Sequence, residues 1–166
     1  MLTGFEPIWN ASCRVLVLGS MPSVKSLEQN EYYAHPRNAF WPIMRQLLTG
    51  QPPPAHGHGD YAARCNMLLE SGIALWDVCF SCEREASSDA SIRSEVPNDI
   101  AGLAARMPLK CILLNGGTAS ALYRRHIALD IPCLRLPSTS PAYTLAYARK
   151  LEAWREALIS GGISVK

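Results

Sequence analysis

Short apolar runs alternate along this chain with segments of helical periodicity, and no other feature of the sequence restricts the possible folds as strongly. The four runs that are short and apolar enough to be strands are 14–18, 73–78, 111–114 and 133–136. The first and third are almost continuously apolar, which is typical of strands buried on both faces of a sheet. Strands that alternate with helices in this way build parallel sheets with helices on both sides. The sequence therefore predicts an α/β fold in which three layers, αβα, are built on a four-stranded parallel sheet.

The segments between these runs predict helices. Apolar residues recur at helical spacing after Pro36 and stop at Gly50 and the prolines that follow it. Four further helices are expected at 60–70, 98–106, 117–126 and from Pro141 to near the end of the chain. Residues 51–59 and 82–95 have few apolar side chains, so we interpret them as surface loops. Neither loop resembles a linker, and residues 1–166 are expected to form a single domain of ordinary size.

Composition and charge exclude some classes of protein without choosing among the rest. Hydrophobic residues make up 48% of the chain and charged residues 18%, and no apolar run is long enough to span a bilayer. Residues 1–10 lack the basic and apolar regions of a secretory signal, which predicts a cytoplasmic protein without a membrane partner. The net charge of +2 permits nucleic-acid binding but does not indicate it.

Six cysteines are spread along the chain, and in a reducing compartment they are expected to be small core residues and not disulfides. Only Cys79 and Cys82 have the spacing of metal ligands. A zinc site needs about four ligands, and no second pair stands at a suitable distance. We therefore expect no metal, no iron–sulfur cluster and no organic cofactor. A redox or zinc function of Cys79 and Cys82 is the alternative.

Polar loops follow three of the predicted strands, at the place where a binding site is expected. In an open α/β sheet, ligands bind beyond the carboxyl ends of the strands. The loops at 19–23, 115–118 and 137–141 are rich in Gly, Ser, Pro and Asn. Their backbone N–H groups and hydroxyls suit a phosphate or a polar planar base. The sequence therefore predicts one site shared by the three loops.

A fourth polar segment, YYAHPRNAFW at 32–41, leads into the first long helix. Aromatic residues interleaved with His, Arg and Asn suit stacking on a base and gripping its edge or a phosphate. Phe40 and Trp41 are better explained as anchors of the helix on the sheet. Tyr33 and Asn38 are the candidates for ligand contact. His35 either contacts a phosphate or only braces the loop.

The order and spacing of these segments resemble a known family. The run GSMPSVKSLEQNEYYAHPRNAFW is similar to the first motif of the mismatch-specific and thymine branches of the uracil-DNA glycosylase superfamily. LLNGGTA resembles the third-strand segment of that superfamily, and LPSTSPAYT resembles its DNA-intercalating loop. The resemblance spans residues 14–144. It implies the spatial strand order 2-1-3-4, with the four strands numbered along the chain, and hydrolysis without a cofactor.

One position departs from those two branches in an informative way. They carry an asparagine that positions water where this chain has Met21, and a thioether cannot orient a nucleophile. The departure resembles the hypoxanthine-DNA glycosylase branch, whose pocket amides match Asn38 and Asn115, our catalytic candidates. The expected base-binding residues are Gly19, Ser20, Met21, Tyr33 and His35. The expected DNA-binding residues are Ser138, Thr139, Ser140 and Tyr143, although Ser140 before Pro141 is also a good helix cap.

The predicted function is that of a monomeric, monofunctional DNA repair glycosylase. It flips a deaminated base, hypoxanthine above others, out of double-stranded or single-stranded DNA and hydrolyses its N-glycosidic bond. The departing base gains negative charge, so amide donors speed its departure. Asn38 either meets the base with Asn115 or holds the attacking water. The alternatives are a uracil or mismatch glycosylase, and a binding module for DNA or nucleotides without catalytic activity.

Overall fold

Four parallel strands form the central sheet in the computed structural model, which describes residues 1–166. In spatial order they are β3 (Ile73–Asp77), β2 (Val15–Gly19), β6 (Cys111–Asn115) and β7 (Cys133–Leu136). Val15 of β2 lies opposite Ile73 on one side and Cys111 on the other. Numbered along the chain, this is the order 2-1-3-4, so the predicted sheet is confirmed.

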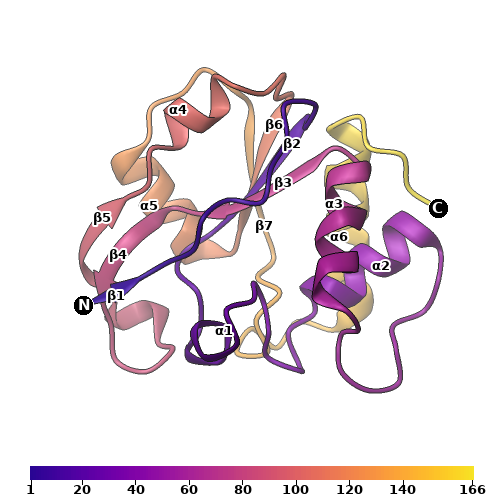
Figure 1. Ribbon diagram of the computed structural model, residues 1–166, viewed down its shortest axis with the longest axis horizontal. Coiled ribbons are helices and arrows are strands. Elements are labelled where there is room, and N and C mark those ends of the chain that lie inside the picture. Colours follow the sequence, from indigo (N-terminus) through magenta and orange to yellow (C-terminus); the bar gives the residue numbers. More distant parts are fainter.

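Helices cover both faces of this sheet, as the strand sequences require. Val15 and Val17 of β2 belong to one apolar cluster, whereas Leu16 and Leu18 belong to a second, because successive side chains of a strand point to opposite faces. Helices α2 (Phe40–Thr49), α3 (Tyr61–Glu70) and α6 (Tyr147–Ser160) pack on the first face. Helices α4 (Ile100–Ala104) and α5 (Gly117–His126) lie on the other side of the sheet (Figure 1). None of the helices is long and apolar enough to cross a membrane.

A second, antiparallel sheet includes both ends of the surface loop that was predicted at 82–95. Its strands lie in the order β1 (Leu2–Thr3), β4 (Cys79–Glu83) and β5 (Arg93–Pro97), with a 3-10 turn, η1 (Asp89–Ser91), between the last two. The loop prediction holds for 84–92 and was wrong at 82–83 and 93–95, because one face of this sheet is exposed. Phe80 and Val96 are about half exposed, and two register shifts interrupt the alternation that marks a strand.

The helices differ most from the predicted ones at two places. A short helix, α1 (Val24–Gln29), was not predicted; the hydroxyl of Ser23 caps it by accepting a hydrogen bond from the N–H of Ser26. Helix α6 begins at Tyr147 and not at Pro141. The carbonyls of Ser140 and Tyr143 accept hydrogen bonds from the ammonium of Lys150 at 3.1 and 2.7 Å. The Ser140 carbonyl also accepts from the N–H of Tyr143 at 3.0 Å, so this segment forms a turn that a side chain stabilises, and not the first turn of the helix.

Candidate active site

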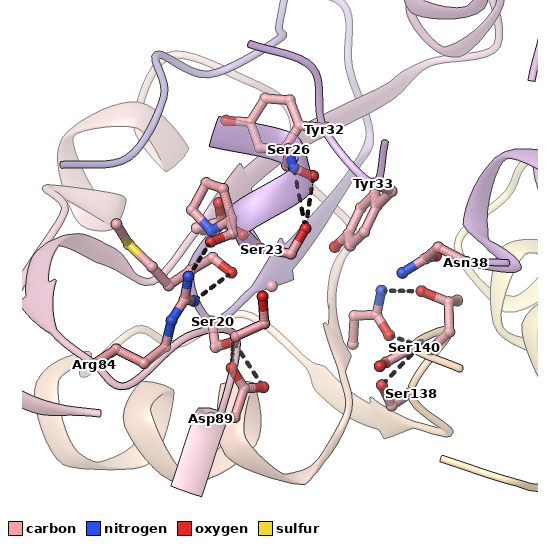
Figure 2. A pocket seen from close by; sticks show the side chains of 17 residues that line it. Ser20, Ser23, Ser26, Tyr32, Tyr33, Asn38, Arg84, Asp89, Ser138 and Ser140 are labelled. Atoms are coloured by element: carbon pink, nitrogen blue, oxygen red, sulfur yellow. Dashed lines mark hydrogen bonds between the residues drawn. The ribbon is translucent and has the colours of Figure 1, made fainter. Parts of the chain in front are cut away.

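A pocket of about 120 Å³ opens at the carboxyl ends of three strands of the central sheet. Gly19, Asp77 and Asn115 are the last residues of β2, β3 and β6, and all three line it. The rest of the wall comes from the loops after β2 and β7, from α1, and from segments 32–38 and 84–89. Figure 2 shows polar side chains of these segments pointing toward one another across the pocket. The pocket therefore lies where strand topology predicts a binding site.

The structure brings together nine of the eleven residues predicted from the sequence. The nine that line the pocket are Gly19, Ser20, Met21, Tyr33, Asn38, Asn115, Ser138, Thr139 and Ser140. His35 is not among them; its Nδ1 accepts a hydrogen bond from the N–H of Arg37, which braces the loop. Tyr143 is also outside, 48% exposed, in a shallow depression beside Gly117 and Ser138.

Thr139 holds Asn115 in place. The amide of Asn115 donates to the Thr139 hydroxyl and accepts from the Thr139 N–H, both at 3.0 Å. The carbonyl of Thr139 accepts a hydrogen bond from the N–H of Ala39, so the loop after β7 also holds segment 32–41. Gly116 permits this approach, because its φ is +97° and a Cβ there would lie 3.0 Å from the Cβ of Ser138. Asn115 is thus rigidly oriented, and Thr139, 1% exposed, is turned inward.

Asn38 uses one end of its amide for structure and leaves the other free. Its Oδ1 accepts a hydrogen bond from the N–H of Phe40 at 2.9 Å, at the start of α2. Its Nδ2 makes no hydrogen bond within the protein, and Figure 2 shows this nitrogen directed into the pocket. The side chain is only 9% exposed. Asn38 therefore offers a fixed donor to whatever occupies the pocket.

Tyr33 lines the pocket with a strained backbone. Its φ is +52°, in the left-handed region that costs a non-glycine residue about 1–2 kcal/mol. Its ring packs on Phe40 with centroids 4.4 Å apart, and its hydroxyl is buried without a hydrogen-bond partner. The preceding residue is firmly held, because the carbonyl of Tyr32 accepts from the indole of Trp41 at 2.6 Å. Strain of this kind is typical of functional sites, where it fixes a side chain in a required direction.

On another wall of the pocket, Asp89 and Arg84 hold the loop after β2 by hydrogen bonds. The hydroxyl of Ser20 lies 3.1 Å from both carboxylate oxygens of Asp89 and donates to them (Figure 2). The guanidinium of Arg84 donates to the carbonyl of Pro22 at 2.7 Å and to that of Met21 at 3.5 Å. Burial raises the pKa of Asp89, whereas the Ser20 hydroxyl and the Arg84 charge act to lower it. The loop after β2 is thereby fastened to the segment between β4 and β5.

Asp77 is the more buried of the two carboxyl groups that line the pocket. Its side chain is 3% exposed and accepts no hydrogen bond from the protein. Burial, followed by the charge of Asp89, raises its pKa to about 7, although the charge of Arg84 acts in the other direction. A carboxyl group perturbed in this way inside a pocket is typical of functional sites.

Sequence reasoning missed Asp77, Arg84 and Asp89. The strand-end rule was applied to the loops after the first, third and fourth strands. Applied to the second strand, it would have found Asp77, which the predicted range 73–78 placed inside the strand. Arg84 and Asp89 lie in the segment predicted to be a surface loop, and no signal in the sequence links that segment to the pocket.

Possible metal ligands do not gather anywhere in the structure. No group of three or more His, Cys, Asp or Glu side chains is arranged to hold a metal ion. Cys79 and Cys82 are buried free thiols, and burial raises the pKa of both, that of Cys79 to about 12. Thiols of this kind are inert at neutral pH. Elemental analysis of the purified protein would test the prediction that it binds no metal.

The sequence matches a family model over nearly its whole length. The model describes the Uracil DNA glycosylase superfamily, and it matches residues 7–159. This chain belongs to that superfamily. It is therefore an enzyme of the DNA glycosylase type, and its substrate is DNA. The matched residues include every strand of the central sheet and every segment that lines the pocket.

Two relatives and one solved structure are similar to this superfamily member. A hypoxanthine DNA glycosylase of Methanosarcina barkeri (strain Fusaro / DSM 804) is 30% identical over 155 residues, which cover 93% of this chain and 96% of that protein. A hypoxanthine DNA glycosylase of Methanosarcina acetivorans is 31% identical over 146 residues, 84% and 86% of the two chains. A solution NMR structure of a Methanosarcina acetivorans protein, proposed to be a uracil DNA glycosylase, superposes with a TM-score of 0.73. It is 29% identical and covers 93% of this chain and 96% of its own.

Proposed function

We propose that this glycosylase removes hypoxanthine from DNA, as a monomer and without a cofactor. The observation that carries the proposal is the free amide donor of Asn38 beside the ring of Tyr33, in a pocket whose first loop holds Met21. The names of the two Methanosarcina relatives support the same base. Met21 packs in the apolar cluster with Leu18 and Val78, and its thioether cannot orient water.

In this proposal Tyr33 holds the flipped base, and the two asparagines donate hydrogen bonds during the reaction. The flipped base stacks on the free face of Tyr33, whose other face packs on Phe40. The Nδ2 of Asn38 and the remaining N–H of Asn115 then donate to the base as negative charge develops on it. Asn38 can serve equally well by holding the attacking water. In both roles its donor is most useful in the transition state.

The lining of the pocket supports hydrolysis and not strand cleavage. A glycosylase that also cleaves the strand needs an amine to form a Schiff base with the sugar. No lysine lines the pocket, and the buried ammonium of Lys150 is engaged by two carbonyls. The expected product is therefore an intact abasic site.

The loop at 137–143 is the part that meets the duplex in this proposal. Ser138 and Ser140 line the rim of the pocket, where their hydroxyls can meet backbone phosphates. Tyr143 is exposed next to them and can enter the space that the flipped base leaves. Thr139 faces inward, so its part is to hold Asn115.

The test is incubation of the protein with duplexes that carry one inosine, uracil or xanthine, followed by alkali. Strand scission at inosine, faster than at uracil, would support the proposal. Faster scission at uracil would replace it with a uracil or mismatch glycosylase. A gel shift of every duplex without alkali-labile sites would indicate a binding module. Scission before alkali treatment would contradict the monofunctional assignment.

A further inference from the structure

The carboxyl group of Asp77 lines the pocket and receives no hydrogen bond from the rest of the protein. Its Oδ2 is fully buried without a partner, and no hydrogen bond reaches Oδ1 either. Nearly all buried polar groups in folded proteins have a partner, so an exception requires an explanation. Asp77 lines the ligand pocket, and its Oδ1 is not among the fully buried atoms, so a ligand is the natural partner of Oδ1.

The carboxyl group is held in one place although nothing binds it directly. The amide of Asn98 donates to the carbonyls of Asp77 and Cys79 at 2.8 and 3.1 Å, which fixes the backbone on both sides of Val78. Gly19 lies opposite Asp77 in the parallel pair. A Cβ on Gly19 would stand 2.5 Å from Oδ1 of Asp77 and 2.9 Å from the hydroxyl of Tyr33. The carboxyl group and the stacking ring therefore share one wall of the pocket, in space that only glycine leaves open.

The surroundings of Asp77 favour its protonated form. Burial is the main cause, the carboxylate of Asp89 adds to it, and the guanidinium of Arg84 opposes it, so that the pKa is about 7. The other titratable groups near it are neutral at this pH, since burial raises the pKa of each: Tyr32, Tyr33 and Cys79. Asp77 is thus a neutral acid in a large fraction of molecules at pH 7, where an ordinary aspartate is ionised.

The two forms of Asp77 have opposite effects on a departing base. An ionised carboxylate beside the base would repel the negative charge that develops as the glycosidic bond breaks. A neutral acid would stabilise that charge by donating a hydrogen bond and then a proton. We propose that Asp77 is a catalytic residue, the general acid that protonates the departing purine. This inference rests on the proposed function.

The step balances without a further reactant. The electron pair of the bond between C1′ and N9 goes to the base, and the proton of Asp77 goes to a ring nitrogen of the base. Water adds its oxygen to C1′, and its released proton returns to the carboxylate. Hypoxanthine has unprotonated ring nitrogens besides N9, whereas uracil has none besides N1, so this acid suits a purine.

The experiment is the pH profile of kcat/KM for an inosine duplex, with wild type and Asp77→Asn. Because kcat/KM reports the free enzyme, the wild-type value should fall as pH rises through about 7, where the acid ionises. Asp77→Asn cannot transfer a proton, so below pH 7 it should be about a hundredfold or more slower, and its profile should lack this fall. Asp89→Asn should move the wild-type fall to lower pH, because it removes a charge that raises the pKa of Asp77.

Asp130→Asn is the matched control, since Asp130 is an exposed carboxylate outside the pocket and its loss should change neither rate nor profile. Binding of each variant to a duplex with a reduced abasic site shows that folding and DNA affinity are kept. A wild-type rate for Asp77→Asn, or a fall near pH 7 that persists in it, would overturn the role of Asp77 alone. Wild-type protein that excises no base would overturn the proposed function together with this inference.

Discussion

At the scale of single residues, some polar side chains of the pocket are hydrogen-bonded within the protein and others have no partner there. Ser20, Thr139 and Asn115 use their polar atoms to fasten loops together. The Nδ2 of Asn38, the hydroxyl of Tyr33 and the carboxyl of Asp77 have no partner. Unpaired buried polar groups cost free energy, so the folded protein maintains them against its own stability. They are the groups with which a ligand gains most.

The first prediction concerns Asn38→Ala. Removing a donor to the departing base or to the water should lower single-turnover excision of inosine by about a hundredfold or more. The lost bond to the N–H of Phe40 should cost about 1 kcal/mol of unfolding free energy, which leaves the protein folded. Asn38→Asp keeps this acceptor but not the donor, so it should restore stability and not activity. Wild-type excision by Asn38→Ala would leave Asn115 as the main candidate.

The second prediction is that Asp77→Asn stabilises the protein. The pKa of Asp77 rises from 3.8 to about 7 on folding, so the folded state holds the proton more tightly than the unfolded chain. Wild-type stability should therefore fall as pH rises from about 4 to 7, and the neutral amide should not show this loss. Three pKa units set an upper limit of about 4 kcal/mol on the gain above pH 7. Chemical denaturation of both proteins at pH 4 and pH 8 measures this gain. An equal difference in unfolding free energy between Asp77→Asn and wild type at the two pH values would contradict the prediction.

At the scale of elements, the sequence predicts the helices and strands that have a regular apolar spacing. It does not predict the strands and loop contacts that depend on residues far away in the chain. The strands of the central sheet and helices α2, α3 and α5 were predicted because apolar spacing defines them, and a Gly or Asp cap marks one end of each helix. The antiparallel sheet was missed, since β5 has the exposed sequence RSEVP and depends on β4 for its pairing. In the pocket, strand ends could be predicted, but the approach of Asp89 to Ser20 across 69 residues could not.

The third prediction concerns Lys150 of α6, which holds the loop proposed to meet the duplex. Its buried ammonium donates to the carbonyls of Ser140 and Tyr143 and lies 5.5 Å from the ring of Tyr143. Lys150→Met keeps the aliphatic chain but removes the ammonium that holds both carbonyls, so excision from a duplex should fall about tenfold or more. Excision from a single strand should fall less, because no gap in a stack needs filling.

Lys150→Arg should recover most of the duplex activity, because a guanidinium can also donate to two carbonyls. Arg149→Met, which removes an exposed charge one residue away, controls for the loss of net charge. Equal losses on single and double strands would show that Lys150 supports the whole domain and not the duplex-facing loop.

At the scale of the whole molecule, one sheet joins two apolar cores. Strand β2 is the element they share most directly, since its side chains alternate between the clusters and it pairs with strands on both sides. The pocket lies at the end of this strand. Figure 1 shows α2 on one side of β2 and the antiparallel sheet on the other. We propose that residues 1–166 unfold as a single domain, since each apolar core includes side chains of the central sheet and would lose them if the sheet unfolded.

The last prediction tests this cooperativity with Leu18→Ala. Leu18 is fully buried in the second core, so its truncation should cost about 2–5 kcal/mol and lower the unfolding temperature by about 5–15 °C. Hydrogen exchange of α2, which packs on the first core, should accelerate as much as that of α5, which packs on the second. Val17→Ala, a truncation on the first face of the same strand, should accelerate both helices equally as well. Faster exchange confined to the helix on the truncated side would show that the two layers unfold separately. In that case the pocket would lie between two units, and the relative positions of Asn38 and Asp77, which both line it, would depend on what holds the units together.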